Sequence, residues 1–166
     1  MTSLDVQGAS DAAFWPSILH GLKELSCPRN LYNLSKGYSS HRIAVMTTNN
    51  VSIKRRVTKG CPQGSCCGLG FWNVLYSSLL NLDLTSHWKA IAFADNLMIL
   101  TRGERVVEAE NYMNLGVRKI LEWAINNKLK FKEKSKVMLM SRRRRREKEI
   151  EIYVNNKILK QVNSLK

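Results

Sequence analysis

The stretch Ile91-Ala92-Phe93-Ala94-Asp95-Asn96-Leu97-Met98-Ile99-Leu100 decides how this chain folds. Two short apolar runs of β type flank Asp95 and Asn96, so the pattern predicts a hairpin with a carboxylate and an amide at its tip. A charge framed by Ala94 and Leu97 is costly to bury without a partner, and a divalent cation is one such partner. An Asp-Asn pair is also favourable turn chemistry between two strands. The segment alone leaves both a metal site and a plain turn open.

Apolar periodicity on either side of this hairpin predicts a mixture of helices and strands. Apolar residues spaced by three and four indicate helices, whereas alternation indicates strands that are covered on one face. The expected elements are a strand over residues 3–6, helices over residues 16–25 and 31–38, a hairpin over residues 43–57, helices over residues 67–82 and 104–127, strands over residues 129–131 and 137–140, and a hairpin over residues 150–159. This order indicates an α+β fold in which an antiparallel sheet carries helices on one face.

Charge and length narrow the class of protein. The 166 residues suit one domain, and Lys and Arg number 27 against 13 Asp and Glu, giving a formal charge of +14. Such an excess predicts a polyanionic partner, with nucleic acid favoured over a membrane surface. No apolar run approaches the roughly 20 residues of a spanning helix, and the N-terminus has no signal-peptide pattern. We therefore expect a soluble intracellular protein, in the nucleus or the cytoplasm, that binds nucleic acid and no membrane.

Short motifs in a fixed order carry a resemblance to a known enzyme family. They are Leu4-Asp5-Val6-Gln7-Gly8-Ala9, Gly60-Cys61-Pro62-Gln63-Gly64-Ser65, Phe93-Ala94-Asp95-Asn96, and Leu129-Lys130-Phe131 with Lys134-Ser135. The set resembles the reverse transcriptases of non-LTR, LINE-type retrotransposons, and the stretch from Arg56 to Ser65 is especially similar to the insect site-specific elements. The resemblance implies one polymerase palm domain over residues 1–166, with the fingers, thumb and endonuclease of the family missing. It also implies RNA-directed DNA polymerase activity on an RNA template, a DNA primer and dNTPs.

The resemblance assigns a catalytic role to the carboxylates. Nucleotide addition is an in-line displacement at phosphorus, in which two divalent ions stabilise the attacking and leaving oxygens. By the resemblance, Asp5 and Asp95 bridge these ions and the Val6 carbonyl is a further oxygen ligand. Hard oxygen ligands of this kind imply Mg²⁺. Taken alone, Asp5 would equally suit a surface carboxylate.

The resemblance also implies substrate contacts. Gln63 and Gly64 resemble the family's loop between the incoming nucleotide and the template, where a glycine lets the backbone approach a ligand closely. An ordinary Pro-Gln-Gly turn is the alternative. Lys134 resembles the basic residue near the leaving pyrophosphate, where a cation stabilises charge or donates a proton. A solvated surface lysine is the alternative at that position.

Asn96 and Ser10 depart from the family's pattern. The family usually has a second aspartate at the position of Asn96, and an amide nitrogen cannot coordinate a metal. The family favours an aromatic residue where Ser10 stands, under the incoming sugar, so the preference for deoxyribonucleotides is in doubt here. We therefore expect catalysis by this chain to be weak or lost. The alternative function is that of a non-catalytic, nucleic-acid-binding remnant.

Basic side chains are the predicted nucleic-acid contacts. The unbroken run from Arg142 to Arg146 suits phosphate contact or nuclear import, and it equally suits a solvated loop. The sequence indicates no oligomeric state. The residues predicted to contact nucleic acid are Arg55, Arg56, Lys59, Arg142, Arg143 and Arg144.

Overall fold

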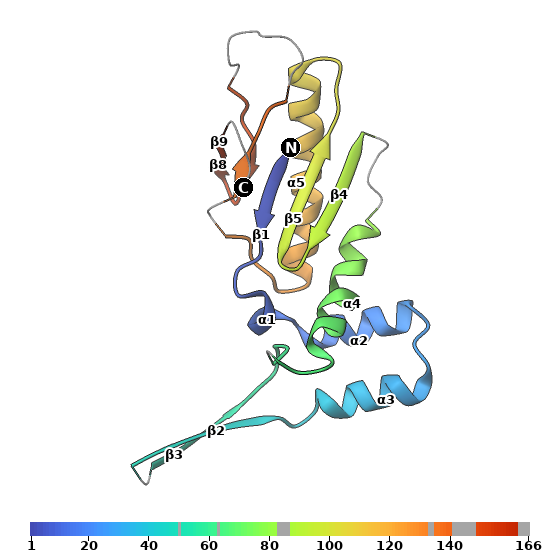
Figure 1. Ribbon diagram of the computed structural model, residues 1–166, viewed down its shortest axis with the longest axis vertical. Helices are drawn as coiled ribbons and strands as arrows, with labels where there is room; N and C mark the ends of the chain where they lie inside the picture. The colour runs from blue at the N-terminus through green and yellow to red at the C-terminus, as the bar shows by residue number, and fades with distance from the viewer. Residues whose placement is uncertain (50, 63, 83–86, 133–134, 141–148, 163–166) are drawn as a thin grey trace. The chain divides into compact units, whose positions relative to one another are not determined.

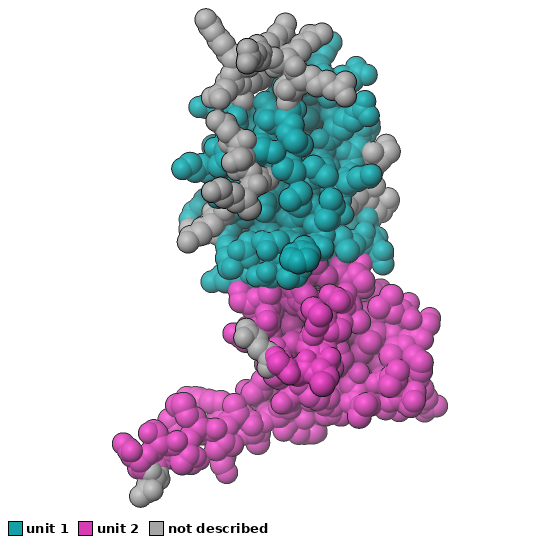
Figure 2. All heavy atoms as spheres, in the orientation of Figure 1, with its two compact units in different colours: residues 1–7, 79–166 teal, residues 8–78 magenta. Residues whose placement is uncertain are grey.

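The chain forms two compact units, each with its own packing. The computed structural model describes residues 1–166 except 50, 63, 83–86, 133–134, 141–148 and 163–166. The first unit consists of residues 1–7 and 79–166, and the second consists of residues 8–78 (Figure 2). Each unit is described by itself below.

A five-stranded sheet in the order β4-β5-β1-β6-β9 forms the centre of the first unit. The pairs β4 with β5, β5 with β1 and β1 with β6 are antiparallel, and β6 with β9 is parallel. The strands are β1 (Thr2–Asp5), β4 (Trp88–Phe93), β5 (Asn96–Thr101), β6 (Lys136–Val137) and β9 (Lys160–Gln161). The antiparallel pairs confirm the predicted sheet type.

Helix α5 (Val106–Asn126) covers one face of this sheet (Figure 1). Alternation along the strands decides which face it covers. Leu4 and Leu97 are cross-strand partners and both are fully buried, whereas the next cross-strand pair, Asp5 and Asn96, is only partly covered or exposed. Because successive side chains of a strand point to opposite faces, the buried pair faces the helix. Asp5 and Asn96 therefore lie on the face away from α5.

Helix α5 approaches the sheet closely at Gly116. A Cβ atom built on this residue would overlap the six-membered ring of Trp88, the first residue of β4. Gly116 and Trp88 are both buried, so the ring fills the space that a side chain would take. A glycine is required here for packing rather than for backbone conformation.

The C-terminal hairpin of the first unit is attached to α5 by an asparagine. The hairpin pairs β7 (Tyr153–Val154) with β8 (Lys157–Ile158). Asn114 of α5 donates from Nδ2 to the Glu151 carbonyl at 2.9 Å and accepts at Oδ1 from the Tyr153 amide at 3.1 Å. These two hydrogen bonds hold the segment that leads into β7 against the helix.

The second unit is a small helical cluster with a hairpin. Its elements are α1 (Ala9–Ala12), α2 (Trp15–Glu24), α3 (Arg29–Tyr38), β2 (Ile43–Thr48), β3 (Val51–Arg56) and most of α4 (Gly68–Leu80).

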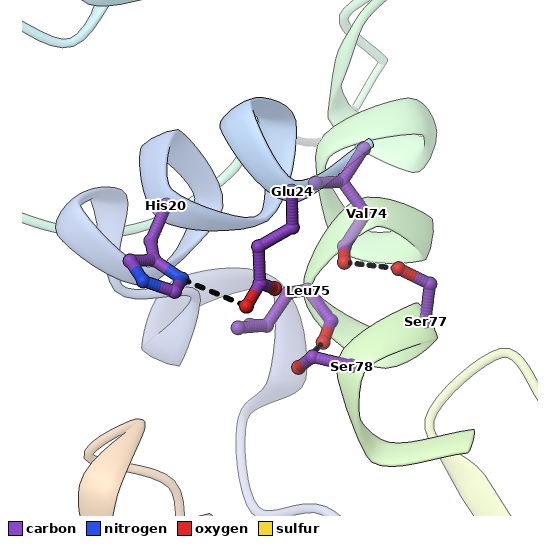
Figure 3. A network of polar contacts seen from close by, with 6 residues as sticks. All are labelled: His20, Glu24, Val74, Leu75, Ser77 and Ser78. Carbon is purple, nitrogen blue, oxygen red and sulfur yellow. Dashed lines mark hydrogen bonds and ion pairs between the residues drawn. The ribbon is translucent and has the colours of Figure 1, made fainter. Parts of the chain in front are cut away.

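Helices α2 and α4 pack closely at Gly21. A Cβ atom built on Gly21 would lie 3.0 Å from Cγ1 of Val74. Figure 3 shows the polar contacts around this crossing: His20 Nδ1 lies 3.5 Å from Glu24 Oε1, and the Ser77 hydroxyl donates to the Val74 carbonyl at 2.8 Å. Both of these contacts run within a single helix, so apolar packing joins the two helices.

Most of the predicted elements are confirmed, and two predicted strands are wrong in whole or in part. Residues 129–131 form no strand and make only an isolated bridge between Phe131 and Val6. The strand expected over residues 137–140 is limited to β6, because its antiparallel partner β1 pairs with it only at Thr2 and Ser3. Among the helices of the described residues, none has the length and hydrophobicity needed to span a bilayer.

Candidate active site

Asp5 and Asp95 come together at one end of the sheet. Asp5 is the last residue of β1, and Asp95 lies in the turn between β4 and β5. The Val6 amide donates to the Asp95 carbonyl at 3.1 Å, which extends the pairing of β1 and β5 by one residue. Asp5 is also the cross-strand partner of Asn96. The topology therefore brings together the residues predicted to be catalytic from segments about half the chain apart.

The turn at the hairpin tip consists of Ala94 and Asp95. Phe93 and Asn96 are cross-strand partners, so Asn96 belongs to β5 and not to the turn that an Asp-Asn pair predicts. Ala94 has a φ of 52°, in the left-handed region that residues with a Cβ atom disfavour. The backbone at the tip is therefore strained where it presents Asp95.

Lys132 contacts Asp5 directly. Its Nζ lies 2.8 Å from Asp5 Oδ2, and its amide donates to the Asp5 carbonyl at 2.7 Å. The Lys132 side chain is 40% exposed and that of Asp5 is 32% exposed. The sequence analysis did not identify this lysine, because 27 lysines and arginines give no local signal that distinguishes one of them.

The charges around Lys132 favour its ammonium form. The hydrogen bond to Asp5 raises the pKa of Lys132, burial opposes this increase, and the negative charges of Asp5 and Asp95 raise it further. Lys132 is therefore a cation in direct contact with Asp5.

The second oxygen of the Asp5 carboxylate fits a metal ligand. Oδ1 is buried and has no hydrogen-bond partner in the described part of the chain. A buried oxygen without a partner is costly, and hard oxygen donors suit a divalent cation. Within the described ranges, no three His, Cys, Asp or Glu side chains come together to hold a metal ion. The side-chain donors that fit a divalent cation here are the carboxylates of Asp5 and Asp95, and Asn96 offers a neutral amide oxygen in place of a third carboxylate.

The sheet face that carries the carboxylates is open and partly apolar. Phe93, Asn96 and Asp5 form one row across β4, β5 and β1. Phe93 is 81% exposed, and Ile91, which points to the same face two residues earlier, is 51% exposed. Large exposed apolar side chains that are grouped in this way mark a binding surface.

Other predicted residues belong to the second unit. Ser10 lies in α1, where its carbonyl accepts a hydrogen bond from the Cys61 amide at 2.6 Å. Lys59 is exposed and forms an isolated bridge with Phe14, so the loop that carries it runs along α1. Gly64 has a φ of 79°, which a residue with a side chain would adopt only with strain.

Arg55 and Arg56 lie on opposite faces of the hairpin formed by β2 and β3. Cross-strand partners share a face, and Arg56 pairs with Ile43 whereas Arg55 pairs with Ala44. Lys54 is on the same face as Arg56, and these two side chains line a hollow of about 350 Å³ together with His41 and Ile43. A flat surface placed against the hairpin would therefore meet either Arg55 or the pair Lys54 and Arg56.

The remaining predicted site residues cannot be placed. Gln63, Lys134, Arg142, Arg143 and Arg144 lie outside the described residues.

Comparison with known proteins identifies the family of the chain. Residues 1–161 match the family described as Reverse transcriptase (RNA-dependent DNA polymerase). The chain is 34% identical over 102 residues to a 115 kDa protein in the type-1 retrotransposable element R1DM of Drosophila melanogaster, a match that covers 61% of this chain and 10% of that protein. It is 32% identical over 94 residues to a retrovirus-related Pol polyprotein from the type-1 retrotransposable element R1 of Bradysia coprophila, covering 57% of this chain and 9% of that protein.

A third relative comes from a different element. The RNA-directed DNA polymerase from the mobile element jockey of Drosophila funebris is 25% identical over 127 residues, which is 74% of this chain and 14% of that protein. The matches therefore span about a tenth of the length of these relatives. The match over residues 1–161, the palm-like sheet and the R1 and jockey relatives show that the chain belongs to the reverse transcriptase (RNA-dependent DNA polymerase) family of LINE-type retrotransposons.

Proposed function

We propose that this chain provides the palm of an RNA-directed DNA polymerase that extends a DNA primer on an RNA template with dNTPs. The observation that carries the proposal is the convergence of Asp5 and Asp95 at one end of neighbouring strands, with a buried Asp5 oxygen that has no hydrogen-bond partner among the described residues. Asp5 and Asp95, together with the Val6 carbonyl, would hold Mg²⁺. When bound, this ion would supply Lewis-acid stabilisation of charge on the phosphoryl oxygens.

The residues around the carboxylates would position the substrates. The open sheet face beside Phe93 and Ile91 offers an apolar surface for the end of a primer–template duplex. In the second unit, Lys54 and Arg56 are exposed cations of the hairpin that would contact nucleic-acid phosphates. Asn96 offers only a neutral carbonyl oxygen where a further carboxylate would bind metal more strongly, so we expect slow turnover.

A non-catalytic role in nucleic-acid binding is the second candidate. It is favoured by the small number of carboxylates at the site and by the formal charge of +14. Basic surfaces bind the phosphate backbone without needing a metal ion. The two candidates therefore differ in the expected effect of removing a site carboxylate. A polymerase would lose dNTP incorporation, whereas a nucleic-acid-binding protein would keep its affinity for nucleic acid.

Template-primed incorporation of dNTPs with MgCl₂ tests the polymerase proposal, after circular dichroism has shown that each variant is folded. Asp95→Asn should abolish incorporation and leave nucleic-acid affinity within about twofold, because the substitution removes one charge and keeps the side-chain shape. Glu122→Gln is the matched control, since Glu122 is exposed on α5. Incorporation by Asp95→Asn equal to that of the parent chain would refute the site. Nucleic-acid binding without incorporation by any variant, Asn96→Asp included, would favour the second candidate.

A further inference from the structure

The position of Lys132 is set by its main chain and not only by its charge. Residues 130–132 run antiparallel to residues 5–7, with the Gln7 amide donating to the Lys130 carbonyl at 2.8 Å and the Lys132 amide donating to the Asp5 carbonyl at 2.7 Å. The hydroxyl of the buried Ser135 donates to the Lys132 carbonyl at 2.9 Å. The backbone is thus held on both sides of Lys132, directly beside Asp5.

This arrangement extends the row of the sheet by one residue. Phe93, Asn96, Asp5 and Lys132 lie side by side across four neighbouring segments. The ammonium is therefore on the sheet face of the carboxylates, at one end of the row, and its Nζ contacts Asp5 Oδ2 at 2.8 Å. An ammonium at this distance takes a place on the carboxylate that a metal ion would otherwise take.

We propose that Lys132 is an internal counter-ion of Asp5, which holds the carboxylate in the absence of a metal ion and competes with a divalent cation for it. The inference rests on the proposed function, since it takes Asp5 as a metal ligand. Asp5 and Asp95 carry two negative charges, Asn96 carries none, and Lys132 cancels one of the two. A divalent cation that binds here is repelled by the ammonium as long as Lys132 stays at Asp5.

The consequence is that Lys132 limits metal affinity and is a positioning residue. Occupation of Asp5 Oδ2 by the ammonium keeps the carboxylate oriented, with Oδ1 buried beside it. Metal binding must break this ion pair or tolerate the nearby positive charge. Because Asn96 is neutral, only two carboxylates oppose the charge of the lysine, which makes the effect of Lys132 larger in relative terms.

Direct binding of Mn²⁺ to the full chain, measured by electron paramagnetic resonance of free Mn²⁺ without nucleic acid or nucleotide, tests this proposal. Lys132→Met should bind Mn²⁺ about three- to tenfold more tightly than the parent chain, since a neighbouring unit charge in a partly exposed site contributes on this order. Lys132→Arg should bind as the parent chain does, because the charge is kept. Lys130→Met is the matched control, since it removes the same charge from an exposed side chain two residues away.

Two further measurements separate the inference from the proposed function. Asp5→Asn should weaken Mn²⁺ binding, and if it does not, the metal site itself is wrong. If Asp5→Asn weakens binding while Lys132→Met and the parent chain have equal dissociation constants, only the role of Lys132 is overturned. The role of Lys132 is also overturned if Lys132→Met binds Mn²⁺ more weakly than the parent chain does, or if neither Lys132→Met nor the parent chain binds Mn²⁺. The rise in melting temperature with added MnCl₂, which should be larger for Lys132→Met, reports the same competition through stability.

Discussion

Asp5 and Asn96 lie directly opposite each other in the antiparallel pairing of β1 and β5, on the sheet face away from α5. A charged and a neutral oxygen-bearing side chain thus share one cross-strand position, where the family usually places two carboxylates. This pair makes the local stability of the sheet depend on the charge at position 96.

Asn96→Asp should lower the free energy of unfolding by about 0.5–1 kcal/mol without metal, because like charges placed directly opposite each other repel. Added MgCl₂ should raise the melting temperature of this variant more than that of the parent chain, since the folded state would bind the ion more strongly. Thermal unfolding with and without MgCl₂ measures both effects. Asn96→Ser, which adds no charge, is the control, and an equal response of all three proteins to MgCl₂ would contradict the prediction.

The left-handed backbone at Ala94 predicts opposite effects of two substitutions at the hairpin tip. Ala94→Gly should raise the free energy of unfolding by about 0.5 kcal/mol, because the relief of strain slightly exceeds the entropy that glycine loses on folding. Ala94→Val should lower it by about 1–2 kcal/mol, since a β-branched residue tolerates this conformation least. Urea denaturation measures both values. Stabilities in the order Val above Gly would show that the turn is not strained.

Thr2 places a hydroxyl in the core without a partner. Its side chain is fully buried and Oγ1 has no hydrogen-bond partner in the part of the chain that the structure describes. Thr2→Val should therefore raise the free energy of unfolding by about 1 kcal/mol. Thr101→Val is the matched control and should lower it by a similar amount, because the Thr101 hydroxyl donates to the Ala109 carbonyl at 3.2 Å. Urea denaturation in which Thr2→Val is the less stable of the two would refute the prediction.

Gly116→Ala should destabilise the first unit by about 3 kcal/mol or more, since the added methyl group overlaps the rigid ring of Trp88. Trp88→Leu in the same chain should recover part of this loss, which a double-mutant cycle of unfolding free energies would show. Gly70→Ala in α4 is the control, because no atom lies within 4 Å of a Cβ built there. Additive effects of the substitutions at positions 116 and 88 would mean that the two residues are not in contact.

The hairpin register predicts which cations contact nucleic acid. Replacing Lys54 and Arg56 together by alanine should reduce the slope of log affinity against log salt by about 1.4–1.8, because each phosphate contact contributes about 0.7–0.9. Arg55→Ala should leave the slope nearly unchanged, since this side chain lies on the opposite face from the hollow beside His41. Fluorescence anisotropy with a labelled primer–template over a range of salt concentrations measures the slopes. A larger effect from Arg55→Ala would assign the contact to the other face.

Periodicity was sufficient to predict the hairpins and every helix except the four-residue α1 (Ala9–Ala12), because apolar spacing reports which face of an element is covered. Helix α5 lies within two residues of its predicted bounds at the N-terminus and one residue at the C-terminus. Strand β9 was not predicted, since Lys160 and Gln161 have no apolar alternation and their pairing depends on the neighbouring β6. Short strands at the side of a sheet are determined by their partners more than by their own residues.

The candidate site likewise contains residues that the local sequence predicts and one residue that it does not. The positions of Asp5 and Asp95 could be predicted because their motifs and flanking strands are local. The contact of Lys132 with Asp5 joins residues separated by 127 positions and depends on how residues 130–132 align with β1. No local pattern encodes that alignment, so one lysine among many gave no indication of its role.

The hairpin of β2 and β3 has a consequence for the dynamics of this protein. Every residue of its two strands is exposed, and no other strand of the described residues joins its sheet. A two-stranded ribbon without a covered face is marginally stable in water, so its amide hydrogens should exchange with solvent through local opening. The amides of β1 and β5, next to the buried Leu4 and Leu97, should exchange only when the first unit unfolds. Slower exchange over residues 43–56 when nucleic acid is added would then map its contact with the hairpin one amide at a time.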